Sequence, residues 1–461
     1  MNGCRSGWFG PLPLLLALIA FALLQRVPNA MAVEPEGVDF SMAYRMALEM
    51  DPTWLAARER SRADVEERAL GRAGLLPNLS YRYSRARNWS EVRQDTAAGE
   101  ITSDLDYSSY SSAFSLTQPL FDAAAYAQYR EGQARAQAAG LTLERARQAL
   151  AVRVLEAYTA VLYAEDQLAL AETQRRSLEE DTLRAAAFVA GGEGTRTDQL
   201  EIEARLRVVE AEEIQAHDAL LDARNALRVL TGAVLLDAPL ARLDQSASLA
   251  LDAERPLEQW QQLALERNPE LAAGRRLLEA SRQQVKAARA GHLPSMRVYA
   301  RRQLNDSSAE NQVGQRYDTD SLGVEVNLPI YAGGRVSAAS DQAQAELEEA
   351  IHRLDGTTRE LLNDLERQYR TLLSSQRRSD AYAQAVSAAS QRLEATRRSI
   401  LGGERTNLDA LDAERQRFET MRDFQRARYD QLLAWLSLRW QAGVLEQGDI
   451  DKVSALFASA G

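Results

Sequence analysis

The chain has 461 residues, of which 45% are hydrophobic, 26% charged and 7% aromatic, a composition that suits a folded protein and excludes a disordered or collagen-like one. Its formal net charge is -11, and all but two of its 55 basic residues are arginine, the exceptions being Lys286 and Lys452. Because nucleic-acid affinity rests mainly on neutralising phosphates, an acidic chain without a lysine-rich run is not expected to bind nucleic acid.

Residues 1–32 have the features of a secretory signal peptide. Arg5 precedes the apolar stretch Pro11–Leu24, and Ala30-Met31-Ala32 follows it as a small-x-small cleavage site. The alternative is a membrane anchor, but this stretch is too short to cross the roughly 30 Å hydrocarbon core as a helix. We therefore expect an exported chain whose mature form begins at Val33.

The only cysteine, Cys4, lies ahead of the apolar stretch and not at the cleavage point, where a bacterial lipoprotein would need it. Neither a disulfide nor a lipid anchor is expected. After the signal no run approaches 18 apolar residues, so the exported chain is predicted to be either soluble or a β-barrel.

The rest of the chain contains two copies of one plan. Pro52 recurs as Pro269 and Gly74 recurs as Gly291, both at an offset of 217 residues. Matching residues at a constant offset indicate an internal repeat. We divide the chain into a first repeat at 33–238, a connector at 239–254 and a second repeat at 255–461, and each repeat is predicted to contain short helices, two strands and a long helical hairpin.

After the short helices of each repeat the hydrophobic period drops to two. Leu322, Val324 and Val326 alternate with polar residues or glycine, and Leu79, Tyr81 and Tyr83 do the same in the first repeat. These segments are predicted to be strands with one apolar and one polar face. The polar segments 91–106 and 305–320 are predicted to be exposed loops that join the two strands of each pair.

Four strands are too few to close a barrel, since the smallest transmembrane barrels have eight. If the strands face lipid, other copies of the chain must complete their edges, because unpaired backbone is not tolerated in hydrocarbon. A four-stranded soluble sheet with one wet face fits the alternation equally well. The strand pattern alone leaves both interpretations open.

The longest segments are helical. Residues 123–190 carry small or apolar side chains at heptad spacing, and at 1.5 Å per residue this helix is about 100 Å long. Gly191 and Gly192 end it, and a second helix is predicted at 197–230. The glycines are interpreted as a helix C-cap, because a dinucleotide-binding loop would have to follow a strand. The second repeat has the same pattern, with Gly402-Gly403 before a helix at 407–440.

Taken in chain order, the predicted helices and strands of the two repeats resemble those of the TolC family of outer-membrane efflux and secretion channels. The resemblance covers nearly all of the mature chain, and it is carried by GLLPNLSYRY and GHLPSMRVYA before the strands, TQPLF and LPIYAGG after them, and GTRTDQLEIEARL and GGERTNLDALDAERQ at the helical turns. It implies a mainly α fold with a membrane β-barrel: long antiparallel coiled-coil hairpins plus four strands per chain, in a trimer with a shared twelve-stranded barrel, a helical periplasmic tunnel and an equatorial region built partly from the connector.

The resemblance also implies a passive exit duct located in the outer membrane and extending into the periplasm. The implied partners are two further copies, outer-membrane lipid, a periplasmic adaptor and an inner-membrane transporter, either an ABC exporter of a type I secretion system or a proton-driven drug pump. No catalytic residue, cofactor or metal site is predicted, because the chain has no P-loop, no HExxH motif and only three scattered histidines.

The residues expected to have a specialised role lie at the helical turns. Asp409 and Asp412 are three apart and share a helix face, so a trimer would hold two rings of three carboxylates, where the family narrows its entrance. By resemblance, Arg405 links to a neighbouring helix pair and keeps the entrance closed. The family's latch tyrosine falls on Ile400 here. A solvated acidic helix face is the alternative. The equivalent positions in the first repeat are Thr197, Asp198 and Glu201.

Two other classes of protein share part of this pattern. A periplasmic coiled-coil adaptor would be exported and carry a hairpin, but normally a single hairpin between split β-domains. An exported structural coiled coil would need no strands flanked by proline. An aromatic girdle facing lipid would separate the channel from both. The residues that could supply it are Tyr81, Tyr83, Trp89, Tyr107, Tyr110 and Tyr299.

Overall fold

The structure is a computed structural model that describes residues 38–97, 99–192, 195–232, 239–244, 255–307, 316–402 and 404–458. The predicted signal peptide at 1–32 and the second half of the predicted connector lie outside the described residues.

The described part of the first half of the chain forms three short helices, two strands and a helical hairpin. In order these are α2 (Phe40–Met50), α3 (Pro52–Val65), α4 (Glu67–Ala73), β1 (Asn78–Thr96), β2 (Gly99–Phe121), α5 (Ala123–Gly191) and α6 (Arg196–Thr231). Asp122 caps α5 by accepting a 2.9 Å hydrogen bond from the Ala125 N–H. Gly192 ends α5 in a left-handed conformation with a φ of 81°, which confirms the predicted C-cap.

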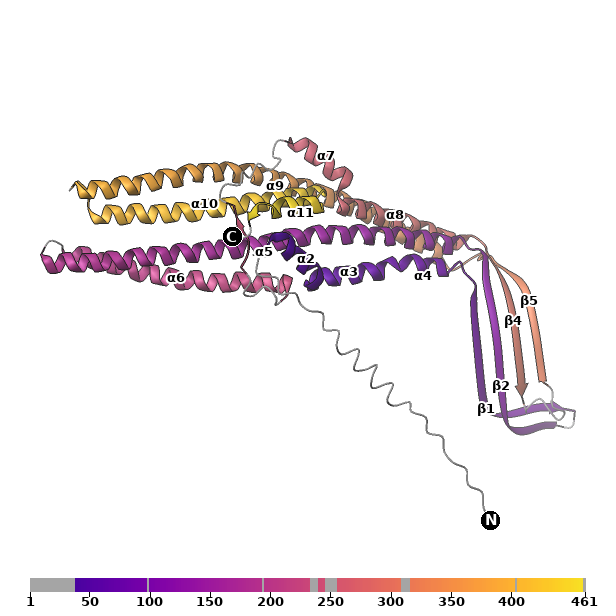
Figure 1. The fold of residues 1–461 in the computed structure, drawn as a ribbon. Helices are drawn as coiled ribbons and strands as arrows, with labels where there is room; N and C mark the ends of the chain where they lie inside the picture. Colours follow the sequence, from indigo (N-terminus) through magenta and orange to yellow (C-terminus); the bar gives the residue numbers. More distant parts are fainter. Residues whose placement is uncertain are drawn as a thin grey trace, which may run out of the picture.

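The second half repeats this order and adds short elements at the middle of the molecule. They are β3 (Arg242–Leu243), α7 (Leu257–Arg267), α8 (Pro269–Arg289), η2 (Ala290–His292), β4 (Ser295–Ser307), β5 (Arg316–Asn327), α9 (Arg335–Leu401), α10 (Asn407–Ala442), α11 (Gln447–Ser454) and β6 (Phe457–Ala458). The α5–α6 and α9–α10 hairpins run side by side, with the sheet at one end of the long helices and both helical turns at the other (Figure 1).

The four long strands form one antiparallel sheet in the order β1-β2-β4-β5. Leu79 pairs with Leu116, Leu116 with Ala300 and Ala300 with Leu322, so the alternating apolar residues near the helix end of the four strands lie on one face. Tyr81, Tyr83 and Trp89 belong to this face by their alternation. Tyr107 and Tyr299 were also candidates for the aromatic girdle, but Tyr107 pairs with Asn88 and Tyr299 pairs with Thr117 and Gly323, so both lie on the opposite, polar face.

The prediction of an exposed loop at 91–106 was wrong, and the one at 305–320 was wrong at 305–307 and 316–320, while 308–315 lie outside the described residues. β1 continues to Thr96 before β2 begins at Gly99, and β4 and β5 also extend into the second segment. The ladder persists because backbone hydrogen bonds hold it, although neither face there is apolar. Hydrophobic period is therefore a poor guide to a strand that has water on both faces.

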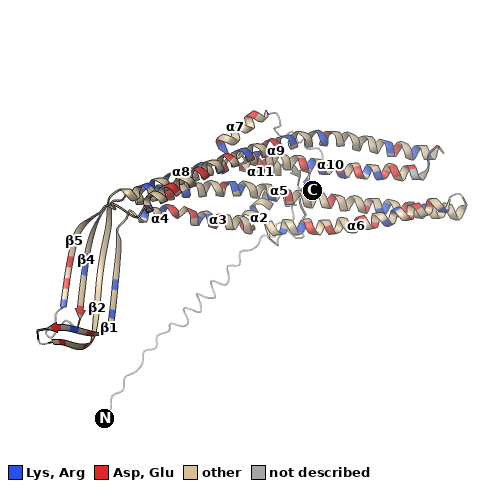
Figure 2. Ribbon diagram, turned by 180° about the vertical axis from the view of Figure 1, so that it is seen from behind, with Lys and Arg blue, Asp and Glu red and all other residues tan. Residues whose placement is uncertain are grey.

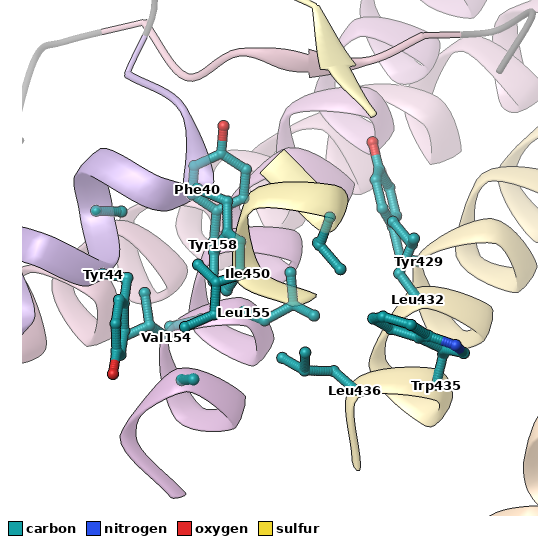
Figure 3. Close-up of a cluster of buried hydrophobic side chains, with 14 of the residues drawn as sticks. Phe40, Tyr44, Val154, Leu155, Tyr158, Tyr429, Leu432, Trp435, Leu436 and Ile450 are labelled. Carbon is teal, nitrogen blue, oxygen red and sulfur yellow. The ribbon is translucent and has the colours of Figure 1, made fainter. Parts of the chain in front are cut away.

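The core lies where the two hairpins meet the short elements (Figure 3). The aromatic ring of Tyr158 packs against those of Phe40 and Phe457, with centroids 6.3 Å and 5.1 Å away. Its hydroxyl lies 2.9 Å from the Val38 carbonyl oxygen and 2.8 Å from that of Ala241, so either can accept its proton. Tyr158 thus ties the start of the described chain and the first part of the connector to α5.

Near the sheet, small residues let helices approach closely. A Cβ placed on Gly132 of α5 would overlap the Glu67 backbone of α4, whereas a Cβ on Gly140 would meet nothing within 4 Å. Both glycines lie inside the same long helix.

We predict opposite effects for Gly132→Ala and Gly140→Ala. Alanine favours a helix over glycine by up to about 1 kcal/mol, so Gly140→Ala should raise the free energy of unfolding. Gly132→Ala should lower it by about 1–3 kcal/mol, because the α4–α5 contact would be overpacked. Guanidinium unfolding followed by circular dichroism measures both, and equal shifts in the two variants would contradict the close approach.

Candidate functional site

The two helical turns form the end of the molecule farthest from the sheet (Figure 1). One joins α5 to α6 and the other joins α9 to α10. All the residues singled out from the sequence lie at these turns or within the first helical turns after them.

Asp409 takes part in the start of α10. Its carboxylate accepts a 2.9 Å hydrogen bond from the Thr406 N–H, and the Thr406 hydroxyl accepts one of 3.3 Å from the Asp409 N–H, which together form a capping box. Arg405 lies 3.5 Å from the same carboxylate. The hydrogen bonds from Thr406 and the nearby Arg405 charge lower the pKa of the Asp409 carboxyl.

Asp412 has a different partner, on the other hairpin. Arg205 of α6 donates a 2.9 Å hydrogen bond to Asp412 and another of 2.9 Å to Glu201. One guanidinium therefore joins a carboxylate of α10 to a carboxylate of α6. The two aspartates, which the sequence treats as a pair, are engaged in separate interactions within one chain.

The remaining predicted residues are close to this contact. Thr197 and Asp198 are exposed in the first turn of α6, where the Asp198 N–H donates a 3.1 Å hydrogen bond to Thr195. The structure thus brings Glu201 together with Asp412. Arg405 lies beside the Asp409 carboxylate of its own hairpin, and within the described residues of this one chain no hydrogen bond or ion pair joins it to Thr197 or Asp198.

Arg205 is a residue of this contact that the sequence did not reveal. Its position four residues after Glu201 indicates a bond within the helix, but nothing in the sequence pairs it with a residue 207 positions away. It is brought there by a small apolar cluster that packs the two hairpins together. This cluster consists of Leu178, Ile202, Leu206, Val209 and Leu411.

A second polar contact joins the hairpins slightly farther from the turns. Glu414 of α10 accepts a 2.9 Å hydrogen bond from Ser177 of α5 and lies 3.2 Å from Arg397 of α9. Burial raises the pKa of the neighbouring Asp181 carboxyl, and the Glu414 charge adds to this. The turn end therefore combines apolar packing with polar ties between helices.

Basic and acidic residues are mixed along both hairpins (Figure 2). In the part of the chain that the structure describes, no three potential metal ligands come together. Among the described helices none is both long and apolar enough to cross a membrane.

Comparisons with known proteins decide the family. The profile of the outer membrane efflux protein family matches residues 43–233 and 260–444. The chain belongs to this family. It is thus a TolC-type channel protein of the outer membrane that extends into the periplasm, as the sequence resemblance indicated, and the family is one of channels and not of enzymes.

Among its relatives are two secretion proteins. The chain is 42% identical to the alkaline protease secretion protein AprF of Pseudomonas aeruginosa, over 90% of this chain and 86% of the relative. It is 36% identical to the proteases secretion protein PrtF of Dickeya chrysanthemi, over 91% of each. The CmeC outer membrane channel of Campylobacter jejuni shares the fold, with a TM-score of 0.76, 15% identity and coverage of 91% of this chain and 89% of that one.

We predict that the start of α10 loosens in acid. The folded-state pKa of Asp409 lies below the ordinary value of 3.8, so its ionised form stabilises the fold above that value, and this is lost as pH falls through the lowered pKa. A spin label on Glu404→Cys should become mobile in that acidic range.

The matched variants are Asp409→Ala and Asp423→Ala. With Asp409→Ala the label should be mobile at every pH, because the capping box is lost. Asp423 is a half-buried residue in the interior of α10 that pairs with the adjacent Arg422, far from the capping box, so Asp423→Ala should keep the acid transition. An unchanged transition in Asp409→Ala would show that the cap does not control this turn.

Proposed function

We propose that three copies of the chain assemble in the outer membrane into a passive exit duct through which secreted polypeptides leave the cell. The observation that carries this proposal is the exposed apolar face of an open four-stranded sheet. The side chains of Leu322, Val324 and Val326 are 81%, 61% and 63% exposed. So large an apolar surface is costly in water and favourable against lipid.

The edges of the sheet support a trimer. β1 and β5 are the outer strands, and among the described residues neither has a second strand beside it. Hydrocarbon offers no hydrogen-bond partner for a free edge, so neighbouring copies must supply one. Three sheets of four strands give a closed barrel of twelve, an even number within the known range.

The relatives support polypeptide secretion over drug efflux. Two of them are named for protease secretion, and both align with about nine-tenths of this chain. On this basis the partners are a periplasmic adaptor and an ATP-driven inner-membrane transporter that supplies the energy. If the partner is instead a proton-driven pump, the cargo would be small molecules.

The helical turns form the periplasmic entrance of this duct. Asp409 and Asp412 are assigned to its constriction, repeated three times around the axis. Arg405, with Thr197, Asp198 and Glu201, is assigned to gating between neighbouring hairpins. Within each chain, the bond from Arg205 to Asp412 supports the closed arrangement, in place of the polar tie that Ile400 does not provide.

Deleting the gene in its host tests the function as a whole. An exported protein, a protease being the first to assay, should disappear from the medium and return when the gene is restored. Normal secretion combined with a new sensitivity to small toxic compounds would favour drug efflux instead. Normal secretion without such a change would contradict the duct.

The membrane assignment predicts that the two faces of β5 differ. Val324→Arg places a charge on the apolar face and should cost about 2–4 kcal/mol at the membrane midplane, whereas Ser321→Arg, on the opposite face, should cost little. The temperature at which the detergent-extracted trimer dissociates measures the difference, and the mass of the complex shows that it is a trimer. An equal loss of trimer stability in the two variants, or a stable monomer of the wild type, would contradict the shared barrel.

The entrance assignment predicts different effects for two kinds of variant. Asp409→Ala with Asp412→Ala should weaken cation selectivity, because rings of carboxylates concentrate cations. Arg205→Met keeps every carboxylate and removes only the tie between hairpins, so conductance should rise while cation selectivity stays. Planar-bilayer recordings measure both quantities. Unchanged selectivity in the double variant would show that the two aspartates only lie on a solvated helix face and do not line the pore.

A further inference from the structure

We propose that a cleft directly beneath the sheet binds the anionic headgroup of a phospholipid from the periplasmic leaflet. The cleft lies between α5 and α8 and has a volume of about 630 Å³. Ala123, the first residue of α5 after β2, lines it together with Leu293, two residues before β4. The cleft therefore marks the level at which the strands give way to helices.

The lining of the cleft changes from apolar to basic away from the sheet. Tyr126 and Leu293, 57% and 49% exposed, lie near the strands. Lys286 and Arg289 follow on α8, and Arg130 lies farther along α5. Lys286 lies in the last turn of α8, and Leu293 follows the short helix η2 seven residues later. An amphiphile has the same order, with acyl chains toward the membrane and an anionic group toward the periplasm.

The three cations are available to a ligand. Arg130 donates to Gln133 at 3.4 Å and Arg289 donates to Gln344 at 3.2 Å, both neutral partners. Among the described residues, no carboxylate forms a salt bridge with either arginine or with Lys286. The lining contains no acidic residue. Phosphate oxygens are the acceptors that such a group of arginine and lysine side chains suits.

Farther from the sheet, the arginines of α8 are partly compensated. Arg282 lies 3.3 Å from Glu279, which also accepts a 2.6 Å hydrogen bond from Gln283. Arg282 thus shares its surroundings with a carboxylate, whereas the lining of the cleft contains none.

The cleft opens on the side of α5 that faces away from the duct. This orientation rests on the proposed function. Tyr126 and Arg130 precede Arg147 and Ala151 by three heptads, so in a coiled coil they lie on the same flank of α5. Arg147 and Ala151 line the contact with α2 and α11. Helices packed inside a duct would block it, so this flank is the outer one, beside the membrane.

The test uses the full mature chain in detergent and phosphatidylglycerol as the probe. Native mass spectrometry should detect phosphatidylglycerol bound to the wild type more tightly than zwitterionic phosphatidylcholine. Arg130→Gln, Lys286→Gln and Arg289→Gln together should weaken phosphatidylglycerol binding by about ten-fold to a hundred-fold. The matched control removes three exposed arginines elsewhere, Arg45→Gln, Arg377→Gln and Arg392→Gln, and should bind like the wild type.

Three results would overturn the proposal. Equal phosphatidylglycerol binding by the triple variant and its control would show that the cleft cations do not bind lipid. Displacement of the lipid by glycerol phosphate at equal concentration would assign the site to soluble phosphate. Protection of a Lys286→Cys thiol from a water-soluble maleimide in lipid-free protein would show that another copy of the chain covers the cleft.

A second measurement leaves the cations in place and does not depend on how the triple variant folds. Brominated phosphatidylglycerol should quench the added fluorescence of Tyr126→Trp more strongly than brominated phosphatidylcholine does, and equal quenching would contradict headgroup recognition. The conductance of the triple variant distinguishes a failure of the proposed lipid site from a failure of the proposed duct function. A variant that conducts normally and still retains the lipid overturns only the lipid site.

Discussion

The arrangement of this molecule in its assembly depends on backbone hydrogen bonding at the two edges of the sheet. β1 and β5 each have a row of N–H and C=O groups with no strand beside it among the described residues. In lipid those groups need partners, and only further copies of the same sheet offer the matching twist and length. Because each strand pair continues directly into long helices, closing the barrel also arranges the hairpins around a common axis, and the position of the entrance follows from the sheet.

The preference for arginine over lysine has a structural counterpart where helices meet. Arg153 makes two 3.1 Å hydrogen bonds to Asp51, the N-cap of α3. Arg145 stacks on Trp440 while bonding Glu270 and Gln441. Arg205 joins two carboxylates from different hairpins. A planar guanidinium can hold two partners in fixed directions, which an ammonium does not do. These arginines thus add polar ties between helices to the apolar packing of the core and of the cluster near the turns.

The elements themselves were largely predictable, and the interactions at the turns were not. Heptad spacing gave α5 to within one residue of Ala123–Gly191, because a long seam repeats its signal many times. The ends of the strands were missed, since polar residues on both faces hide the period of two. Asp409 and Asp412 were identified as neighbours on a helix face, but Asp409 forms a capping box with the N-cap Thr406 and Asp412 bonds Arg205. Local spacing carries no information about such a distant partner.

By itself, the sequence determined the duplicated plan, the long helices and the alternating strands, because these depend on residues close together in the chain. Only the tertiary structure decided the strand order β1-β2-β4-β5, the pairing of β3 with β6 and the cleft between α5 and α8. The pairing of β2 with β4, the pairing of β3 with β6 and the cleft each join segments more than a hundred residues apart, whereas β1–β2 and β4–β5 are local hairpins. Their contacts depend on how whole helices and strands pack, and packing is set by shape and burial in three dimensions, which local periodicity does not encode.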